Sequence, residues 1–582
     1  MKNKEITFKV AFEADTELKQ YGQNALSVFT LSLYLRLDDI HDFAANAITE
    51  GPNDKKADIC YLDVNDKKAI IAQSYLSTDW TKVAASANKA SDLNTAMAWL
   101  LSVGEDRIPA HLKTIAIDLR RALISGDINR IEIFYIHNCH ESHNVNSELK
   151  AVADATRDKV QAIIGDREAP VITYKEFGLE SIEELYKSRD SEILVDEWLD
   201  IPASDYVREK GDGWQAILTT VPGKWIQDLH KQHGDRLFSA NYRDYLGSSK
   251  RSGNINYEIT QTAESEPVNF WVYNNGITAL TYEIKHGRKK KIRGISIING
   301  AQTSGALSEA SGLSTKKTRV SIRFVECPSR DLIDKIILYN NTQNEIKPAD
   351  RRSKDQIQKR LRDEFAKYGI VYVHRRSSLR TPRNAITGTS VAPALCAFHG
   401  EPQISYRNAK EIFGDDDIYE RVFPRNISVE HVFLVRALSI AIDKIKSELN
   451  NKVSNETATQ LEERQYEVLK YSASKHFIFY VVGALTEEIM TRKVSDLFEW
   501  KSIAGVVAPE NVSLANAWTV VLQALLPQIA TIVEQQGKDA FYDVPRSNEK
   551  SKQVARQLKA LVASLESVLS SQFENIRKRS TI

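Results

Sequence analysis

The sequence predicts a mixed α/β (α+β) protein that ends in a helical region. Three observations predict this class: short apolar runs between turn residues before residue 165, a second series between 175 and 425, and helical apolar spacing after Pro424. A chain of 582 residues is long enough for about two to four domains. Its content of 42% hydrophobic and 27% charged residues is typical of a soluble globular protein.

Composition and cysteine spacing argue against several classes of protein. The longest apolar run, Phe477 to Leu485, is well short of the roughly 20 residues that a membrane-spanning helix needs. No apolar signal region follows Met1, so we expect a cytoplasmic protein without membrane contact. The four cysteines lie far apart, which argues against a disulfide framework and against a cysteine zinc site.

The first unit is expected to span residues 1–165 as a small mixed α/β domain. Thr30 to Ile48 has helical spacing, Ala57 to Val64 and Ala69 to Ala72 read as a hairpin, and Ile131 to Ile136 reads as a strand after further helices. A boundary is expected between 165 and 180, where a turn-rich segment precedes a new strand, Val171 to Tyr174.

A histidine-rich string follows the strand Ile131 to Ile136. The segment from His137 to His143 holds three histidines and one cysteine, which are zinc ligands in other proteins. The spacing matches no familiar zinc pattern, and no second cluster of this kind occurs in the chain. A polar loop after an edge strand is therefore favoured over a zinc site.

The second unit, 175–425, is expected to be mixed α/β, and the third, 426–582, to be helical. A helix should begin at Ser181 after the strand at 171. Beyond Pro424, apolar residues are spaced three and four apart in four stretches: Val432 to Leu449, Leu461 to Met490, Ala515 to Val533 and Val554 to Phe573. Such helices usually form a core or contacts between identical subunits, so a homo-oligomer is one expectation.

Three amide-rich strings mark the second unit. Each follows an apolar run that we interpret as a buried element: Phe270 to Tyr273, Ile295 to Ile298 and Leu332 to Tyr339. We predict that Asn299, Gln302, Asn340 and Asn341 line one pocket, because a buried amide without a partner costs about 1 to 3 kcal/mol. The candidate ligand-binding residues are Asn274, Asn275, Asn299, Gln302, Thr303, Asn340, Asn341 and Gln343.

Two of these strings also allow simpler or more specific interpretations. Asn275-Gly276 suits a hairpin turn, because both residue types tolerate positive φ. Ala301 to Ser304 reads as the start of a helix, where free backbone N–H groups favour an anion such as phosphate. No GxxxxGK[ST] string occurs, so a P-loop nucleotidase is not supported.

Basic residues are concentrated in two segments, although the net charge of the chain is only +1. Lys285 to Arg293 holds six Lys and Arg and no acid, and Lys347 to Arg383 holds twelve against four acids. Local positive charge attracts polyanions, and arginine beside tyrosine and histidine suits phosphates and bases. We expect Arg351, Arg352, Arg375 and Arg376 to bind nucleic acid or a nucleotide.

Each basic segment has an alternative interpretation. The shorter one also suits a solvated hairpin tip between two strands. In the longer one, an internal carboxylate is the alternative partner for Arg351 and Arg352, and Asp350 or Ser353 is expected to cap the next helix.

The ordered set of strings resembles the core of the abortive infection phage-resistance (AIPR) family. The resemblance rests on Leu237 to Gly247, Asn256, Phe270 to Thr278, Ile298 to Thr303 and Asn340 to Gln343, with a closing segment that ends at Phe423. It covers roughly residues 175–425. The resemblance implies anti-phage defence, and the core motifs by themselves do not define a molecular activity.

The order of elements in the first unit resembles the PD-(D/E)XK restriction-endonuclease-like domain. In that fold, an Asp that opens one strand and an acid or Gln on the next strand hold a divalent metal, Mg²⁺ or Mn²⁺. The resemblance places Asp58 and Gln73 at these positions and suggests Glu50 as a further carboxylate. The sequence departs from the pattern at Tyr75, where the resemblance implies a lysine.

Tyr75 leaves the chemistry of this domain open. Lys82 or Lys89 is expected to bring an ammonium to the same point if the domain cleaves nucleic acid. One hypothesis is a metal-dependent nuclease that binds nucleic acid through the second unit. The alternatives are a non-catalytic sensor or scaffold that acts with a partner protein, and an accessory of a restriction system.

Overall fold

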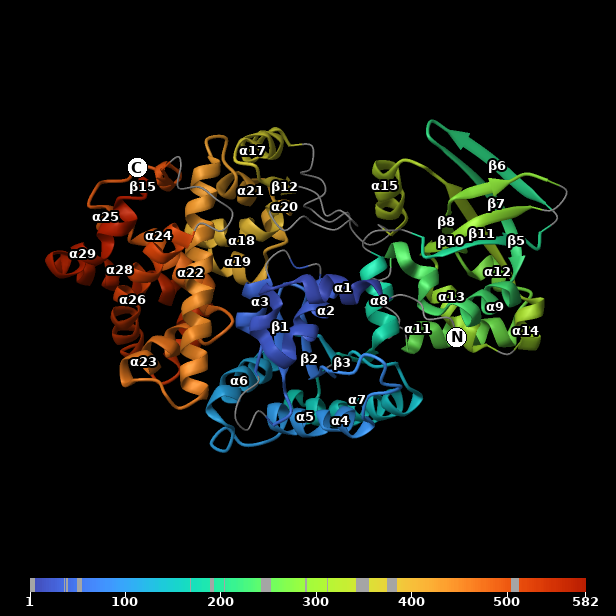
Figure 1. The fold of residues 1–582 in the computed structure, drawn as a ribbon, viewed down its shortest axis with the longest axis horizontal. Coiled ribbons are helices and arrows are strands. Elements are labelled where there is room, and N and C mark those ends of the chain that lie inside the picture. The colour runs from blue at the N-terminus through green and yellow to red at the C-terminus, as the bar shows by residue number, and fades with distance from the viewer. Residues whose placement is uncertain are drawn as a thin grey trace.

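The computed structural model describes residues 6–35, 37, 40–49, 55–167, 169–188, 193–203, 205–241, 253–287, 290–310, 312–341, 355–373, 385–503 and 512–582. The predicted mixed α/β class is confirmed, because helices accompany strands in several sheets. Figure 1 shows three bodies: an N-terminal unit in blue and cyan, a β-rich unit in green, and a helical unit that runs from yellow through orange to red.

The N-terminal unit is built on a four-stranded sheet of order β1-β2-β3-β4. Strands β1 (Ile59–Asp63) and β2 (Lys68–Tyr75) form the predicted antiparallel hairpin, and β3 (Arg130–His137) and β4 (Val171–Phe177) add in parallel. Strands β2 and β3 are almost wholly buried, as near-continuous apolar runs require. Strand β4 follows the boundary expected at 165 and pairs with β3, so this unit runs on through α8 (Leu179–Lys187).

Helices cover both faces of this sheet. One face packs against α4 (Ala87–Ser91), α5 (Leu93–Leu101), α6 (Ala110–Ser125) and α7 (His143–Ile164). The other face packs against α1 (Thr7–Ala14), η1 (Glu17–Asn24), α2 (Ala25–Leu35), α3 (Ile40–Ala47) and α8. The single helix expected over 30–48 is therefore two helices, α2 and α3. Apolar spacing continues across the break, so periodicity did not reveal it.

The β-rich unit contains a second sheet, of order β5-β10-β8-β11-β7-β6, with β9 beside β10. Its strands are β5 (Val195–Asp200), β6 (Tyr206–Gly211), β7 (Trp214–Pro222), β8 (Ile277–Thr281), β9 (Glu283–Lys285), β10 (Lys291–Asn299) and β11 (Arg319–Glu326). Strands β8 and β11 are parallel, whereas the other pairs are antiparallel. The strand predicted at Ile295 to Ile298 and the hairpin at Lys285 to Lys291 are both present.

Helices also flank this second sheet. Apolar residues of α9 (Gly223–His233), α11 (Gly253–Ser265) and α13 (Ala301–Glu309) pack on one face, and α14 (Gly312–Lys317) lies beside α9. Helix α15 (Arg330–Asn341) packs on the other face, and η2 (Gly234–Asn241) lies against β10. Figure 1 shows α15 on the opposite side of the sheet from α9 and α13.

The helical unit shares one apolar core that extends from Leu361 to Ile576. Its helices are α17 (Gln356–Lys367), α18 (Gly388–Phe398), α19 (Pro402–Arg407), α20 (Glu411–Gly414), α21 (Asp416–Val422), α22 (Val429–Ser454), α23 (Gln460–Leu469), α24 (Ser474–Ala484), α25 (Thr486–Met490), η4 (Leu497–Glu499), α26 (Val512–Glu534), α27 (Ala540–Asp543), η5 (Val544–Arg546), α28 (Asn548–Ser564) and α29 (Glu566–Arg577). Two small sheets accompany them: β12 (Val371–Val373) with β13 (Ala385–Thr387), and β14 (Lys501–Ser502) with β15 (Ser580–Thr581).

This core corrects the domain boundary expected at 425. Residues of α17 through α21 precede that boundary, yet they pack with the C-terminal helices and not with the second sheet. Asp355 caps α17 by accepting from the Ile357 N–H at 2.7 Å, whereas Asp350 and Ser353 lie outside the described residues. By length and composition, one described helix, Ser513–Glu534, is apolar enough to cross a membrane, and 56% of its most apolar stretch is buried in the protein.

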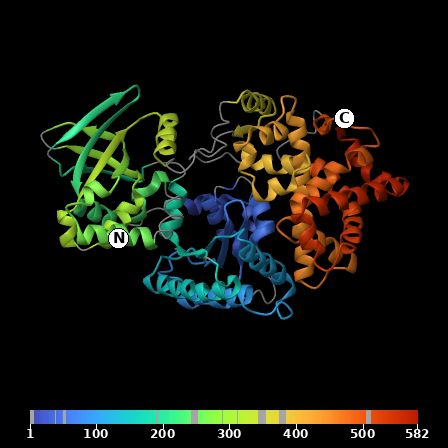
Figure 2. The ribbon, with the colours of Figure 1, turned by 180° about the vertical axis from the view of Figure 1, so that it is seen from behind.

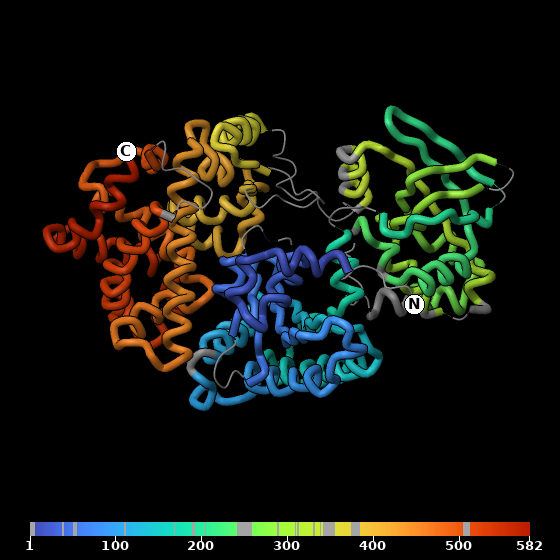
Figure 3. Tube along the Cα trace, in the orientation of Figure 1, coloured from blue at the N-terminus to red at the C-terminus, as the bar shows by residue number. Residues whose placement is uncertain are grey.

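The helical unit docks on the N-terminal unit through polar contacts. Asp118 of α6 pairs with Arg546 of η5, and Lys446 of α22 donates to Asn46 of α3 at 2.7 Å. Figures 2 and 3 show these two bodies side by side, with the β-rich unit on the other side of the N-terminal unit. The N-terminal sheet therefore lies between the other two units.

Candidate functional site

Described residues of the three amide-rich strings meet at one end of the second sheet. Asn274 lies between α12 (Phe270–Tyr273) and β8, Asn299 ends β10, and Asn340 lies in the last turn of α15. Asn274 Oδ1 accepts hydrogen bonds from the Gly276 N–H at 2.9 Å and from Thr303 Oγ1 at 3.1 Å. Asn299 Nδ2 donates to the backbone oxygen of Asn340. Strings separated by up to 41 residues are thus brought into contact.

Two glycines allow this convergence. Gly276 has φ +81°, and a Cβ there would lie 2.4 Å from the Ser321 backbone oxygen. Gly300 has φ +92°, and a Cβ there would lie 2.7 Å from the Gly276 backbone oxygen. The Asn274–Gly276 and Asn299–Gly300 strings therefore pack backbone against backbone, which only glycine permits.

We expect Gly300→Ala to destabilise the β-rich unit by more than about 1 kcal/mol, because alanine adds both a positive-φ strain and a clash with Gly276. Urea unfolding followed by tryptophan fluorescence measures this change. The matched control is Gly305→Ala inside α13, where a Cβ meets nothing within 4 Å and alanine should be neutral or stabilising. Equal effects of the two substitutions would contradict the proposed close packing.

The amide side chains divide into two groups. Asn274 and Asn299 bind neighbouring groups, and Asn340 Nδ2 donates to the Ile336 carbonyl at 2.8 Å, so these three hold the local backbone. Asn275 and Gln302 are exposed. Of the four amides predicted to line one pocket, Asn299 contacts the backbone of Asn340 and Gln302 lies on the surface. A pocket shared by all four stays a prediction.

Exposed aromatic residues accompany these strings. The prediction that Phe270 to Tyr273 is a buried element is wrong: the segment is the short helix α12, and of its four residues only Phe270 is buried. Trp271 and Tyr273 are 49% and 63% exposed, and Tyr339, directly before Asn340, is 64% exposed. Exposed aromatic rings beside amides suit base stacking. The sequence did not predict that these rings are exposed, because they lie in apolar runs that are typical of buried elements.

Most of the remaining predicted site residues fall outside the part of the chain that the structure describes. Asn341 ends α15. Glu50, Gln343, Arg351, Arg352, Arg375 and Arg376 lie outside the described residues. Their expected roles stay predictions.

The basic hairpin at Lys285 to Arg293 is partly neutralised. Arg293 pairs with Asp196 through two hydrogen bonds at 2.9 and 3.1 Å, and Lys291 lies 3.2 Å from Asp200. Lys285 Nζ lies 3.9 Å from the centre of the Trp198 ring. The two aspartates of β5 thus neutralise part of the positive charge of this hairpin.

In the N-terminal unit, Asp58 and Gln73 lie side by side. Asp58 directly precedes β1, and Gln73 lies on β2, so antiparallel pairing brings them together. Gln73 Nε2 donates to Asp58 Oδ2 at 2.8 Å, and the Ser74 N–H donates to the same oxygen at 2.7 Å. Both side chains are more than nine-tenths buried.

Two buried polar atoms beside this pair have no hydrogen-bond partner among the described residues: Gln73 Oε1 and Tyr135 Oη. Gln73 and Tyr135 are paired across β2 and β3, so their side chains project from the same face of the sheet. Leaving such an atom without a partner costs about 1 to 3 kcal/mol. Tyr135 was missed in the sequence because it reads as one more apolar residue of a core strand.

The donor atoms at this point suit a hard divalent cation. Mg²⁺ binds oxygen ligands and commonly uses only one or two carboxylates together with water. Asp58 offers a carboxylate and Gln73 an amide oxygen that no described group occupies. Among the described residues, no three His, Cys, Asp or Glu side chains gather as a metal site. A fit therefore depends on Gln73 and not on a cluster of acids.

Two lysines surround Tyr75, the residue at the position where the resemblance implies lysine. Lys82 Nζ donates to Tyr75 Oη at 2.9 Å, and Lys89 Nζ lies 4.5 Å from the centre of the Tyr75 ring. The hydrogen bond from Lys82 lowers the pKa of the Tyr75 phenol below its ordinary value and raises the pKa of Lys82. Tyr75 is two residues from Gln73 on β2 and shares its face of the sheet.

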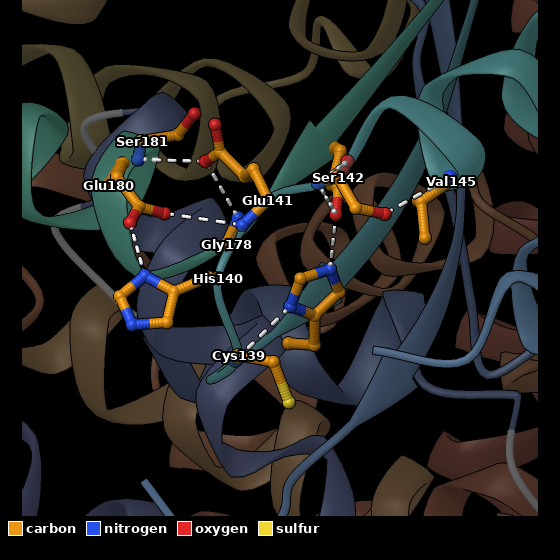
Figure 4. A network of polar contacts seen from close by, with 10 residues as sticks. Cys139, His140, Glu141, Ser142, Val145, Gly178, Glu180 and Ser181 are labelled. Atoms are coloured by element: carbon orange, nitrogen blue, oxygen red, sulfur yellow. Dashed lines mark hydrogen bonds and ion pairs between the residues drawn. The ribbon is translucent and has the colours of Figure 1, made fainter. Parts of the chain in front are cut away.

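The histidine-rich string at 137–143 forms a network of structural contacts (Figure 4). Buried His137 bonds Glu176 at 3.0 Å, and His140 bonds Glu180. Glu141 accepts from the N–H groups of Gly178 and Ser181 at 3.0 and 2.9 Å. These contacts connect the end of β3 to the start of α8. His137 and His140 each bond a different carboxylate and do not bond one another.

The fold defines a mixed α/β protein with an amide cluster at one end of its second sheet. Residues 238–539 match the AIPR protein family. This match covers more than half of the chain, so the protein belongs to the AIPR family, which suggests a role in abortive-infection defence against phage. The match begins later than the expected 175 and extends beyond 425 into the helical unit. No curated protein and no solved structure matches the sequence significantly.

Proposed function

We propose that this AIPR protein binds nucleic acid during phage defence and hydrolyses phosphodiester bonds at Asp58. The proposal also takes the N-terminal unit to be a restriction-endonuclease-like domain. The single observation that carries it is the pair of Asp58 and Gln73, in which the buried Gln73 Oε1 has no described partner. An oxygen of this kind beside a carboxylate is the arrangement that a divalent metal uses.

In this proposal Asp58 and Gln73 hold Mg²⁺ or Mn²⁺, with Glu50 as a further candidate ligand. A bound metal of this kind lowers the pKa of water and stabilises the charge that develops on phosphate. Lys82 supplies the ammonium that Tyr75 cannot, because its Nζ lies at the Tyr75 hydroxyl on the same face of the sheet as Gln73. Lys89 adds a second positive charge near the Tyr75 ring.

The β-rich unit and the segment that follows it supply nucleic-acid binding in this proposal. The exposed rings of Trp271, Tyr273 and Tyr339 suit stacking on bases. The basic residues of 347–383 suit contacts to phosphates. Single-stranded nucleic acid fits best, because its bases are free to stack on exposed rings.

A second candidate is a non-catalytic sensor that acts with a partner protein. Two observations favour it: Tyr75 replaces the expected lysine and holds Lys82 by its hydroxyl, and Asp58 Oδ2 already accepts two N–H groups. In this alternative the Asp58 carboxylate supports the β1–β2 hairpin, and the two orphaned atoms bind water.

Binding is tested apart from cleavage by fluorescence anisotropy in EDTA, with labelled single-stranded DNA, RNA and duplex DNA. We expect charge reversal of Arg351, Arg352, Arg375 and Arg376 to raise the dissociation constant at least about tenfold and to flatten its salt dependence by about one unit of slope per lost phosphate contact. The matched control reverses four exposed cations of the helical unit: Lys444, Lys493, Lys552 and Lys578. Equal losses in both variants would contradict the assignment of the basic segment.

A further inference from the structure

A cavity of about 440 Å³ lies between the N-terminal and helical units. Helix α3, the β1–β2 hairpin and α6 line one side, and α18, α19, α22 and α24 line the other. This volume is within the range of pockets that bind small molecules. The cavity is separate from Gln73 and from the amide cluster, and neither proposed activity uses it.

Most charged groups that line the cavity are held in ion pairs. Lys475 bonds Asp443 at 2.7 Å and also pairs with Asp42, and Lys470 lies 2.7 Å from Glu467. The carboxylates of Asp66 and Asp118 pair with Lys410 and Arg546. Asp63 accepts from the Asp66 N–H at 2.9 Å.

Lys446 differs from these groups. It lines the cavity and is 8% exposed. Among the described residues it donates one hydrogen bond, to the neutral Asn46 Oδ1 at 2.7 Å. An ammonium has three N–H donors, so two are left for another acceptor. Burial lowers the pKa of Lys446 to about 8, although Asp443, Asp118 and Asp42 act in the opposite direction. No described carboxylate lies in contact with this buried cation. An anion bound there would therefore gain a favourable electrostatic interaction in a site that is shielded from water.

The rest of the lining suits a ring and a sugar. Tyr61, Tyr466 and His476 contribute aromatic surface, and Ser439, Asn450 and Ser472 contribute polar groups. Tyr466 Oη already donates to Asn450 Oδ1 at 2.8 Å, so this ring is fixed in place. Fixed aromatic side chains with a few polar groups are the usual composition of a small-molecule site.

We propose that this cavity binds a mononucleotide, with its phosphate on the Lys446 ammonium. Asn46 on α3 and Lys446 on α22 come from different units, so such a ligand contacts both sides of the interface. Binding therefore favours the docked arrangement of the two units and regulates any activity that depends on it. The proposal is independent of cleavage at Asp58.

The experiment uses the purified full chain with AMP, GMP, CMP and UMP, beside adenosine and inorganic phosphate. We expect at least one nucleotide to raise Tm and to bind measurably by calorimetry, and to bind at least about tenfold more tightly than adenosine or phosphate. Lys446→Met should weaken that binding at least about tenfold. Lys444→Met, which changes an exposed lysine on the same helix, should leave it unchanged.

A second measurement needs no variant. Acetylation of wild-type lysines, mapped by mass spectrometry, should slow at Lys446 when the nucleotide is present and should be unaffected at Lys444. The proposal is overturned if none of the four nucleotides binds, if adenosine or phosphate binds as tightly, or if Lys446 is not protected.

Discussion

Replacing Asp58 by asparagine is expected to abolish protection against phage. Asparagine keeps the shape and the oxygen that accepts from Gln73 Nε2 and the Ser74 N–H, so the hairpin should stay folded. The substitution removes the negative charge that the proposed metal requires, which should slow cleavage by about 100-fold or more. The measurement is the plating efficiency of phage on cells that express each variant at equal level.

The matched control for this prediction is Asp154→Asn on α7. Asp154 is an exposed carboxylate of the same unit, and it pairs at the surface with Arg157, at 2.8 Å. It should leave protection intact. Full protection by the Asp58→Asn variant would show that the N-terminal unit is a scaffold and would favour the sensor hypothesis.

Asp118→Asn is expected to destabilise the protein by about 3 to 5 kcal/mol. The Asp118 and Arg546 side chains are only 3% and 7% exposed, and Asp118 also accepts from the Ser472 N–H at 3.0 Å. Without the carboxylate, the Arg546 guanidinium is left buried between the two units without its counter-charge. Urea unfolding should show the loss, and limited proteolysis should show easier access to the interface.

A peripheral ion pair at the same interface provides the control. Arg407 lies 3.3 Å from Asp127, and their side chains are 38% and 23% exposed. Asp127→Asn should cost less than about 1 kcal/mol, because water already screens that pair. Similar losses for Asp118→Asn and Asp127→Asn would contradict the special role assigned to the buried pair.

Local patterns predicted much of the fold. The hairpin of β1 and β2, the strand at Ile131 to Ile136 and the strand at Ile295 to Ile298 were predicted because each is a short apolar run between turn residues. The association of α17 through α21 with the C-terminal helices was not, because it depends on contacts between distant segments. The Asp118–Arg546 pair joins residues that are 428 positions apart in the sequence. Hydrophobic periodicity describes local structure and cannot predict a contact over such a separation.

The candidate sites were predicted in part. The pairing of Asp58 with Gln73 follows from strand register, and the structure has it. Tyr135 was missed, because a tyrosine in an apolar strand looks like core, and its lack of a partner is visible only in three dimensions. The error at Phe270 to Tyr273 has a similar origin, since four apolar residues satisfy both a buried strand and a short exposed helix.

Cleavage by the purified chain tests the central claim most directly. Labelled single-stranded DNA, RNA and duplex DNA are incubated with the wild-type protein and with Asp58→Asn, in Mg²⁺, in Mn²⁺ and in EDTA. The account predicts cleavage of at least one substrate by the wild type, dependent on the metal and lost in the variant. Absence of cleavage by a folded protein that binds these substrates, or equal cleavage by the variant, would contradict it.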